Sequence, residues 1–223
     1  MTEDDQRRLN MVDSQVRTSD VTDRRIQRAM LEVPREMFAP ESLRSMAYMD
    51  SPLPVMARSD GQRMRTLLSP RSFAMLVQLA GIEADSRVLD VGCATGYSTA
   101  ILARLAQSVV AVESDRALAN AAKKNLRALG ATNVAVVEND LTAGAPEAGP
   151  YHAIVLNGAV EQAPLALLEQ LADGGRLVAI VADGALRRAR IWQRAGKTIA
   201  DRPAFEADAE VLPGFEREPE FVF

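Results

Sequence analysis

A glycine-rich turn that follows a short apolar run constrains the fold of this chain more than any other feature. Residues 88–97 read VLDVGCATGY, and a second apolar run, 108–112, ends at Glu113. Glycine adopts backbone angles and permits close approaches that a β-carbon would block, so such a turn brings the backbone up to a ligand. An acid about twenty residues further on is the position that bonds a ribose in doubly wound folds. The pattern predicts a nucleoside-binding α/β sheet.

The spacing of the turn separates two kinds of nucleoside cofactor. A dinucleotide site reads G-x-G-x-x-G and places a pyrophosphate at the next helix N-terminus. This turn reads D-x-G-x-A-x-G, with Ala94 where the middle glycine would be and Asp90 inside the motif. A carboxylate there suits the ammonium of S-adenosyl-L-methionine and does not suit a pyrophosphate. We expect that cofactor, with S-adenosyl-L-homocysteine as product; a glycine turn without a cofactor is the alternative.

From residue 87 onward, short apolar runs alternate with stretches of helical periodicity. Such alternation is typical of a parallel sheet that is covered by helices. We therefore expect an α/β fold of the Rossmann-like, S-adenosylmethionine-dependent methyltransferase type, with a mostly parallel, doubly wound sheet in a core at 81–223. The expected strands are 87–91, 108–112, 133–138, 151–156 and 176–181, with late strands at 188–194 and 205–212; the expected helices are about 96–106, 115–129 and 164–171.

The N-terminal part of the chain has a different pattern. Apolar residues at helical intervals over 9–38 predict two helices. Several prolines then interrupt the chain before another expected helix over 72–79. We expect residues 1–80 to form a helical, loop-rich extension that covers the site, and residues 213–219 to be irregular.

Ligands of open α/β sheets lie at the carboxyl ends of the strands, so candidate site residues should follow strands. Asp140 can accept from the adenine amino group while Leu141 covers the ring, although a turn-forming aspartate is the alternative. The expected cofactor-binding residues are Thr66, Asp90, Gly92, Ala94, Gly96, Tyr97, Glu113, Asn139, Asp140 and Leu141.

Composition excludes several classes of partner. The chain has 26 basic and 30 acidic residues, a formal net charge of -4, so we expect no nucleic-acid partner. The single cysteine, Cys93, excludes an internal disulfide, and the first residues lack the apolar segment of a signal peptide. No window approaches the roughly twenty apolar residues that span a bilayer. We expect a cytoplasmic protein without a membrane anchor.

Other reactive side chains are interpreted as structural. Cys93 would need a base to act as a nucleophile, and the one histidine, His152, opens a different expected strand. With one cysteine and one histidine, no spacing supports a metal site. The basic cluster at 187–190 is interpreted as a solvated strand entry; an acidic substrate or partner is the alternative.

Blocks outside the turn are similar to those of one enzyme family. They read MVDSQVR at 11–17, VPREMF at 33–38, AYMDSPLP at 47–54, PYHAI at 150–154, LLEQL at 167–171 and GGRLV at 174–178. These blocks resemble the protein-L-isoaspartate O-methyltransferase family, over residues from about 9 to 182. The resemblance implies transfer of a methyl group to the α-carboxyl of isoaspartyl residues in damaged proteins, so a protein or peptide is the expected partner.

The segment that positions the acceptor in this family departs from the family pattern here. The family has Thr-Ile-Ser-x-Pro, whereas residues 66–70 read TLLSP, so Leu68 stands at the serine position and Ser69 lies one place later. In an extended segment, a shift of one residue points the side chain the other way. We name Ser69 and the substituted Leu68 as candidate catalytic positions. The loop at 156–164 and the C-terminal segment at 211–215 also depart from the family.

These departures leave two alternatives open. The first is a methyltransferase of the same fold with a different acceptor. The second is a non-catalytic protein that binds the cofactor or a partner. Isoaspartyl methylation remains the leading interpretation, and the sequence makes no prediction about the oligomeric state.

Overall fold

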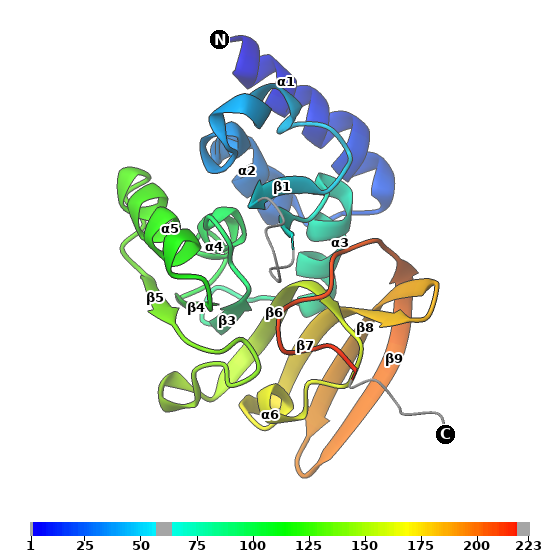
Figure 1. The fold of residues 1–223 in the computed structure, drawn as a ribbon. Helices are drawn as coiled ribbons and strands as arrows, with labels where there is room; N and C mark the ends of the chain where they lie inside the picture. Colours follow the sequence, from blue (N-terminus) through cyan, green and yellow to red (C-terminus); the bar gives the residue numbers. More distant parts are fainter. Residues whose placement is uncertain (1, 57–63, 218–223) are drawn as a thin grey trace, which may run out of the picture.

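The computed structural model describes residues 2–56 and 64–217. A seven-stranded sheet lies at its centre, in the order β5-β4-β3-β6-β7-β8-β9 (Figure 1). The first five strands in sequence run parallel, and the last two are antiparallel because they follow one another through tight turns. The strands are β3 (Arg87–Val91), β4 (Ser108–Glu113), β5 (Val134–Glu138), β6 (Tyr151–Val160), β7 (Leu171–Asp183), β8 (Leu186–Ala195) and β9 (Thr198–Glu206).

Both faces of the sheet are covered, but by different parts of the chain. Alternating residues of a strand point to opposite faces, so Val88 and Leu89 belong to two different apolar clusters. One cluster packs beneath α3 (Pro70–Ala80), α4 (Tyr97–Leu102), α5 (Arg116–Ala128) and the N-terminal segment. The other lies under the short α6 (Leu165–Leu168) and the C-terminal segment around Leu212. The expected Rossmann-like, mostly parallel sheet is confirmed.

The N-terminal segment contains more than helices and loops. It begins with α1 (Glu3–Met11) and α2 (Arg24–Glu32), so two helices are present, although α1 begins six residues before the predicted range of 9–38 and α2 ends at Glu32. It also contains an antiparallel pair of strands, β1 (Leu53–Met56) and β2 (Arg65–Leu67), which the sequence analysis did not predict. Strands this short give no periodic signal. The other elements of this segment are a π-helical turn (Val12–Val16) and 3-10 helices at Arg17–Ser19, Arg35–Phe38 and Glu41–Met46. A further 3-10 helix, Pro146–Ala148, lies between β5 and β6.

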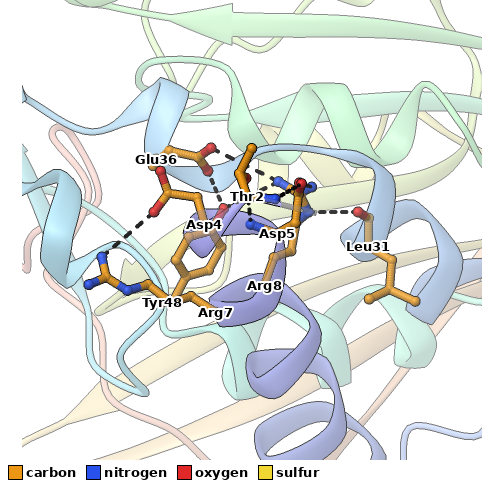
Figure 2. Close-up of polar contacts among 8 residues, drawn as sticks. All are labelled: Thr2, Asp4, Asp5, Arg7, Arg8, Leu31, Glu36 and Tyr48. Carbon is orange, nitrogen blue, oxygen red and sulfur yellow. Dashed lines mark hydrogen bonds and ion pairs between the residues drawn. The ribbon is translucent and has the colours of Figure 1, made fainter.

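A polar cluster fastens α1 to the segment that follows α2 (Figure 2). Arg8 Nε donates to the carbonyl of Leu31 at 2.7 Å, and Arg8 Nη2 donates to Asp5 Oδ1 at 2.5 Å. The hydroxyl of Tyr48 donates to Glu36 and accepts a longer bond, 3.4 Å, from Arg8 Nη1. The pKa of Tyr48 is raised, first by burial and then by the hydrogen bond to Glu36. These bonds hold α1, α2 and the segment up to Tyr48 together within the N-terminal part of the chain.

Two late elements differ from the expectation. The helix expected over 164–171 ends at Leu168, because Leu171 already pairs with Tyr151 as the first residue of β7. The late strand expected over 205–212 is instead β9 (Thr198–Glu206), which is polar and mostly exposed because it forms an edge of the sheet. Between Glu206 and Arg217, the last residue that the structure describes, strand pairing is limited to an isolated bridge at Val211. In the described ranges, no helix is long and apolar enough to cross a membrane.

Candidate functional site

The turn between β3 and α4 has the unusual backbone that its sequence requires. Gly92, Ala94 and Gly96 all have positive φ angles, 74°, 50° and 96°. An alanine rarely adopts this conformation, so the surrounding structure must hold it there. The N–H groups of Gly92 and Cys93 donate to the carbonyl of Val112, at 2.9 and 3.3 Å. The turn is therefore fixed against the end of β4.

The acid at the end of β4 is fully buried and has many hydrogen-bond partners. Glu113 Oε1 accepts from the N–H groups of Ser114 and Asp115, at 2.9 and 3.1 Å, and Oε2 accepts from the N–H of Ala94 at 2.8 Å. Arg65 completes the set, because its Nη1 and Nη2 donate to Oε1 and Oε2 at 2.7 and 2.8 Å. Glu113 thus joins the turn, the start of α5 and β2.

Asp90 is the second buried acid of the site. Its Oδ2 accepts from the hydroxyls of Ser98 and Thr99 at 2.8 and 2.6 Å, and its Oδ1 accepts from Asn157 Nδ2 at 2.5 Å. Burial raises the pKa of Asp90 to about 6, against these three hydrogen bonds, which lower it. The carboxylate sits inside a polar cage that α4 and β6 supply.

The residues after β5 lie at the same edge of the sheet. The N–H of Asn139 donates to the carbonyl of Glu113 at 3.2 Å, and its side chain donates to the carbonyl of Gly144 at 3.0 Å. Asp140 is exposed, whereas Leu141 is buried. The structure therefore brings this segment next to the end of β4, as the parallel register predicts.

The expected acceptor segment is mostly buried. Thr66 and Leu68 have relative exposures of 7% and 2%, and Leu68 packs in the apolar core. Ser69 is the N-cap of α3, because its Oγ accepts from the N–H of Ser72 at 3.3 Å. The hydroxyl that the sequence analysis named as a candidate is thus engaged in capping a helix.

An arginine from the extension lies beside this segment. Arg35 is fully buried and donates to the carbonyls of Ala47 and Leu68, at 2.8 and 2.7 Å. Its guanidinium lies 4.6 Å from the centre of the Tyr97 ring, which also packs edge-on against Phe38. Among the described residues, Arg35 Nη1 and the Tyr97 hydroxyl have no hydrogen-bond partner. Both line a cavity of about 10 Å³ between the acceptor segment and the turn, where one water has room.

The buried acids Asp90 and Glu113 suit a nucleoside with a cationic amino-acid tail, but other side chains of the protein occupy the space beside the turn. A β-carbon on Gly92 would lie 3.0 Å from the Leu212 side chain and 3.3 Å from Arg65 Nη2. A β-carbon on Gly158 would lie 2.6 Å from Leu212. The glycine turn, the acid expected to bind the ribose and the residues expected beside the adenine all lie at the carboxyl ends of the strands. This arrangement suits S-adenosylmethionine, but Arg65 and Leu212 cover the turn.

The other reactive groups have structural partners. Cys93 is a free buried thiol whose pKa burial raises, and His152 Nδ1 accepts from the N–H of Arg87 at 2.9 Å. Within the described ranges, no group of His, Cys, Asp and Glu could hold a metal ion. The basic cluster is ion-paired with β9 and the segment after it, through Arg187 with Asp208, Arg188 with Glu206, and Arg190 with Asp201.

Several residues that contact the candidate site were not predicted from the sequence as site residues: Arg65, Leu212 and Arg35, together with Ser98 and Thr99, which donate to Asp90. Arg65 and Leu212 carry no motif, and their contacts with the turn come from distant parts of the chain. Arg35 lies inside the VPREMF block that supported the family resemblance, so its position in a family motif was an available signal.

Comparisons with known proteins agree with this geometry. The profile of the protein-L-isoaspartate(D-aspartate) O-methyltransferase family matches residues 6–205. A protein-L-isoaspartate O-methyltransferase of Herpetosiphon aurantiacus is 40% identical over 192 residues, which cover 86% of this chain and 83% of that protein. A solved structure of a protein-L-isoaspartate O-methyltransferase has a TM-score of 0.82 at 28% identity, over 93% of this chain and 66% of that one.

A second solved structure supports the fold alone. It is a Plasmodium falciparum beta-aspartate methyltransferase in complex with S-adenosyl-L-homocysteine, with a TM-score of 0.75 at 21% identity, over 92% of this chain and 97% of that one.

Proposed function

Because the chain belongs to the protein-L-isoaspartate(D-aspartate) O-methyltransferase family, we propose that it methylates the α-carboxyl of isoaspartyl residues in damaged proteins, with S-adenosyl-L-methionine as methyl donor. Family membership makes the chain an O-methyltransferase. The observation that carries the proposal is the family match over residues 6–205, which includes both the turn and the acceptor segment. A neighbour of the same fold is described with S-adenosyl-L-homocysteine, the expected product.

The proposed cofactor site uses the carboxyl ends of neighbouring strands. Glu113 bonds the ribose hydroxyls, the turn from Gly92 to Gly96 approaches the nucleoside, and Asp140 and Leu141 take the adenine. Asp90 was expected from the sequence to accept from the ammonium of the cofactor. Because its oxygens already accept from Ser98, Thr99 and Asn157, its proposed role is to orient the turn by holding Ser98 and Thr99 at the start of α4. Thr66, Tyr97 and Asn139 border this site in the proposal.

The chemistry asks for positioning more than for covalent help. The bound cofactor supplies a methyl group on a sulfonium, and a carboxylate attacks it in line. The chain must align the two reactants and exclude water, which can account for much of the rate enhancement of such a displacement. The buried surroundings of Leu68 and Gly92 provide a water-poor environment for that purpose.

We place the acceptor peptide in a hollow of about 600 Å³ that adjoins the acceptor segment. Ser69 and Arg71 at the start of α3 form one wall, and Leu186 in the turn between β7 and β8 forms another. Asp50, Glu206 and Asp208 also line the hollow, and among the described residues no ion pair involves Arg71, so in the proposal its guanidinium is the group that meets a carboxylate of the peptide. An exposed Leu186, at 66%, offers apolar contact.

Leu68 favours one alternative acceptor class. A leucine at the serine position cannot hydrogen-bond a carboxylate, so a methyltransferase with a less polar acceptor is the second candidate. A cytoplasmic location remains part of the proposal, in keeping with the free thiol of Cys93.

The test is transfer of labelled methyl groups to two peptides that differ only in an isoaspartyl or an aspartyl linkage. The proposal predicts labelling of the isoaspartyl peptide and none of its aspartyl partner. Binding of S-adenosyl-L-homocysteine without labelling of either peptide would indicate another acceptor, and absence of both would contradict the proposal.

A further inference from the structure

The carboxylate of Glu113 has no acceptor capacity left in this conformation. A carboxylate offers about four lone-pair sites. Three backbone N–H groups and two guanidinium N–H groups already donate to Glu113, all within 3.1 Å. The hydroxyls of a ribose therefore cannot bond Glu113 unless one of these donors leaves.

Arg65 is the donor that can leave. The three backbone N–H groups belong to the turn and to the start of α5, so they cannot move without unfolding local structure. Arg65 lies at the first position of the three-residue strand β2, and within the described part of the chain its side chain bonds only Glu113. Arg65 and Glu113 are 48 residues apart in the sequence. The long Arg65 side chain can rotate away from Glu113 without a change in the backbone of β4.

The exchange balances in hydrogen bonds. The guanidinium gives two parallel N–H donors to the two oxygens of Glu113. A ribose has two adjacent hydroxyls, which would give two O–H donors to the same oxygens. After the exchange, Glu113 keeps its three backbone donors and gains two hydroxyl donors, so its oxygens stay fully hydrogen-bonded, while the positive charge of the guanidinium is not replaced by the neutral ribose.

We propose that Arg65 competes with the cofactor for Glu113, so that this side chain lowers the affinity of the protein for S-adenosylmethionine and must swing away before the nucleoside binds. The inference rests on the proposed function, because it takes Glu113 as the ribose-binding acid. Leu212 covers Gly92 and Gly158 and is held beside β6 through the 2.8 Å bond from its N–H to the carbonyl of Ala159.

Competition of this kind has a defined thermodynamic effect. The apparent dissociation constant equals the intrinsic one divided by the fraction of molecules in the open state. A buried, bidentate pair makes the open state a minor one. Removing the guanidinium raises that fraction and tightens cofactor binding, although it removes a contact from the native structure.

The experiment compares binding of S-adenosyl-L-homocysteine by calorimetry to the wild type, to Arg65→Met and to Arg17→Met. Arg17 pairs with Asp13 on the surface of the N-terminal segment, so its variant controls for loss of an arginine. Circular dichroism establishes that each variant is folded, and Arg65→Gln replaces Arg65→Met if that variant does not fold. The inference predicts a dissociation constant at least about tenfold lower for the Arg65 variant and no change for the Arg17 variant.

A second measurement uses the wild type. While the Arg65 guanidinium is paired with Glu113, its rotation is restricted, so the Nη protons should give separate nuclear magnetic resonance signals. These signals should merge when S-adenosyl-L-homocysteine is added, because the released guanidinium rotates freely. Equal or weaker binding by the Arg65 variant, or Arg65 signals that stay separated, would overturn the inference while leaving the proposed function intact. No binding by either protein would overturn both.

Discussion

Arg35 Nη2 donates a 2.7 Å hydrogen bond to the carbonyl of Leu68, and this bond joins the 3-10 helix Arg35–Phe38 to the acceptor segment. The same guanidinium donates to the carbonyl of Ala47 and lies over the ring of Tyr97. One side chain thus ties together three segments that are far apart in the sequence.

Arg35→Lys should destabilise the protein although it keeps the charge. An ammonium cannot reproduce the planar fork that reaches both carbonyls and stacks on the ring. A buried carbonyl left without a donor costs about 1–3 kcal/mol, so we expect the free energy of unfolding to fall by about 2 kcal/mol. Urea denaturation measures this change, and equal stability of the two proteins would show that the fork is dispensable.

The pKa of Asp90 predicts how stability depends on pH. Burial raises the pKa from 3.8 to about 6, so the native state binds this proton more tightly than the unfolded chain does. The contribution of Asp90 to stability is therefore greatest below pH about 4 and falls as the pH rises to about 6. The loss is on the order of 3 kcal/mol.

Asp90→Asn isolates this contribution, because the amide has no charge. The difference in unfolding free energy between wild type and variant should shift in favour of the variant between pH 4 and pH 7. Urea denaturation at the two pH values gives this double difference. A difference that does not depend on pH would contradict the raised pKa.

Substitution of Ser69 tests whether the candidate hydroxyl contributes to stability as the N-cap of α3. Ser69→Ala should lower the unfolding free energy by about 1 kcal/mol, because the N–H of Ser72 loses its cap. Ser69→Asn should retain most of the stability, since asparagine is an equally good N-cap. Thermal denaturation of the three proteins measures the order, and equal stability of Ser69→Ala and wild type would mean that the cap contributes nothing.

Arg71 tests the proposed position of the acceptor peptide. Arg71→Glu should raise the KM for an acidic isoaspartyl peptide about fivefold or more, with a smaller effect on kcat, because the contact is made before the methyl group moves. Arg17→Glu reverses a charge on the N-terminal segment and serves as the control. Steady-state kinetics at low salt measures both, and equal KM values would place the peptide elsewhere.

The sequence predicted β3 and β4 almost to the residue, whereas β6 runs four residues past the expected end at 156 and β7 begins five residues before the expected start at 176. β3 and β4 are buried on both faces, so they appear as continuous apolar runs bounded by polar residues. β9 could not be predicted, because a polar edge strand that includes Asp201 and Pro203 has neither an apolar run nor clear alternation. Its position follows from pairing with β8, which is a tertiary contact.

The site shows the same division. The turn and Glu113 were predictable, since local spacing alone places them at the ends of adjacent strands. The pairing of Arg65 with Glu113 depends on where β2 lies relative to the end of β4. That is a tertiary contact, which no local sequence pattern predicts. The cage around Asp90 was predictable only in part, because Ser98 and Thr99 belong to the next helix whereas Asn157 comes from β6.

The most direct test of this account is a crystal structure of the protein with S-adenosyl-L-homocysteine. The account predicts the ribose hydroxyls within hydrogen-bond distance of Glu113, the adenine beside Leu141, and the Arg65 guanidinium displaced from the carboxylate. A nucleoside bound elsewhere, with the ion pair of Arg65 and Glu113 intact, would contradict it.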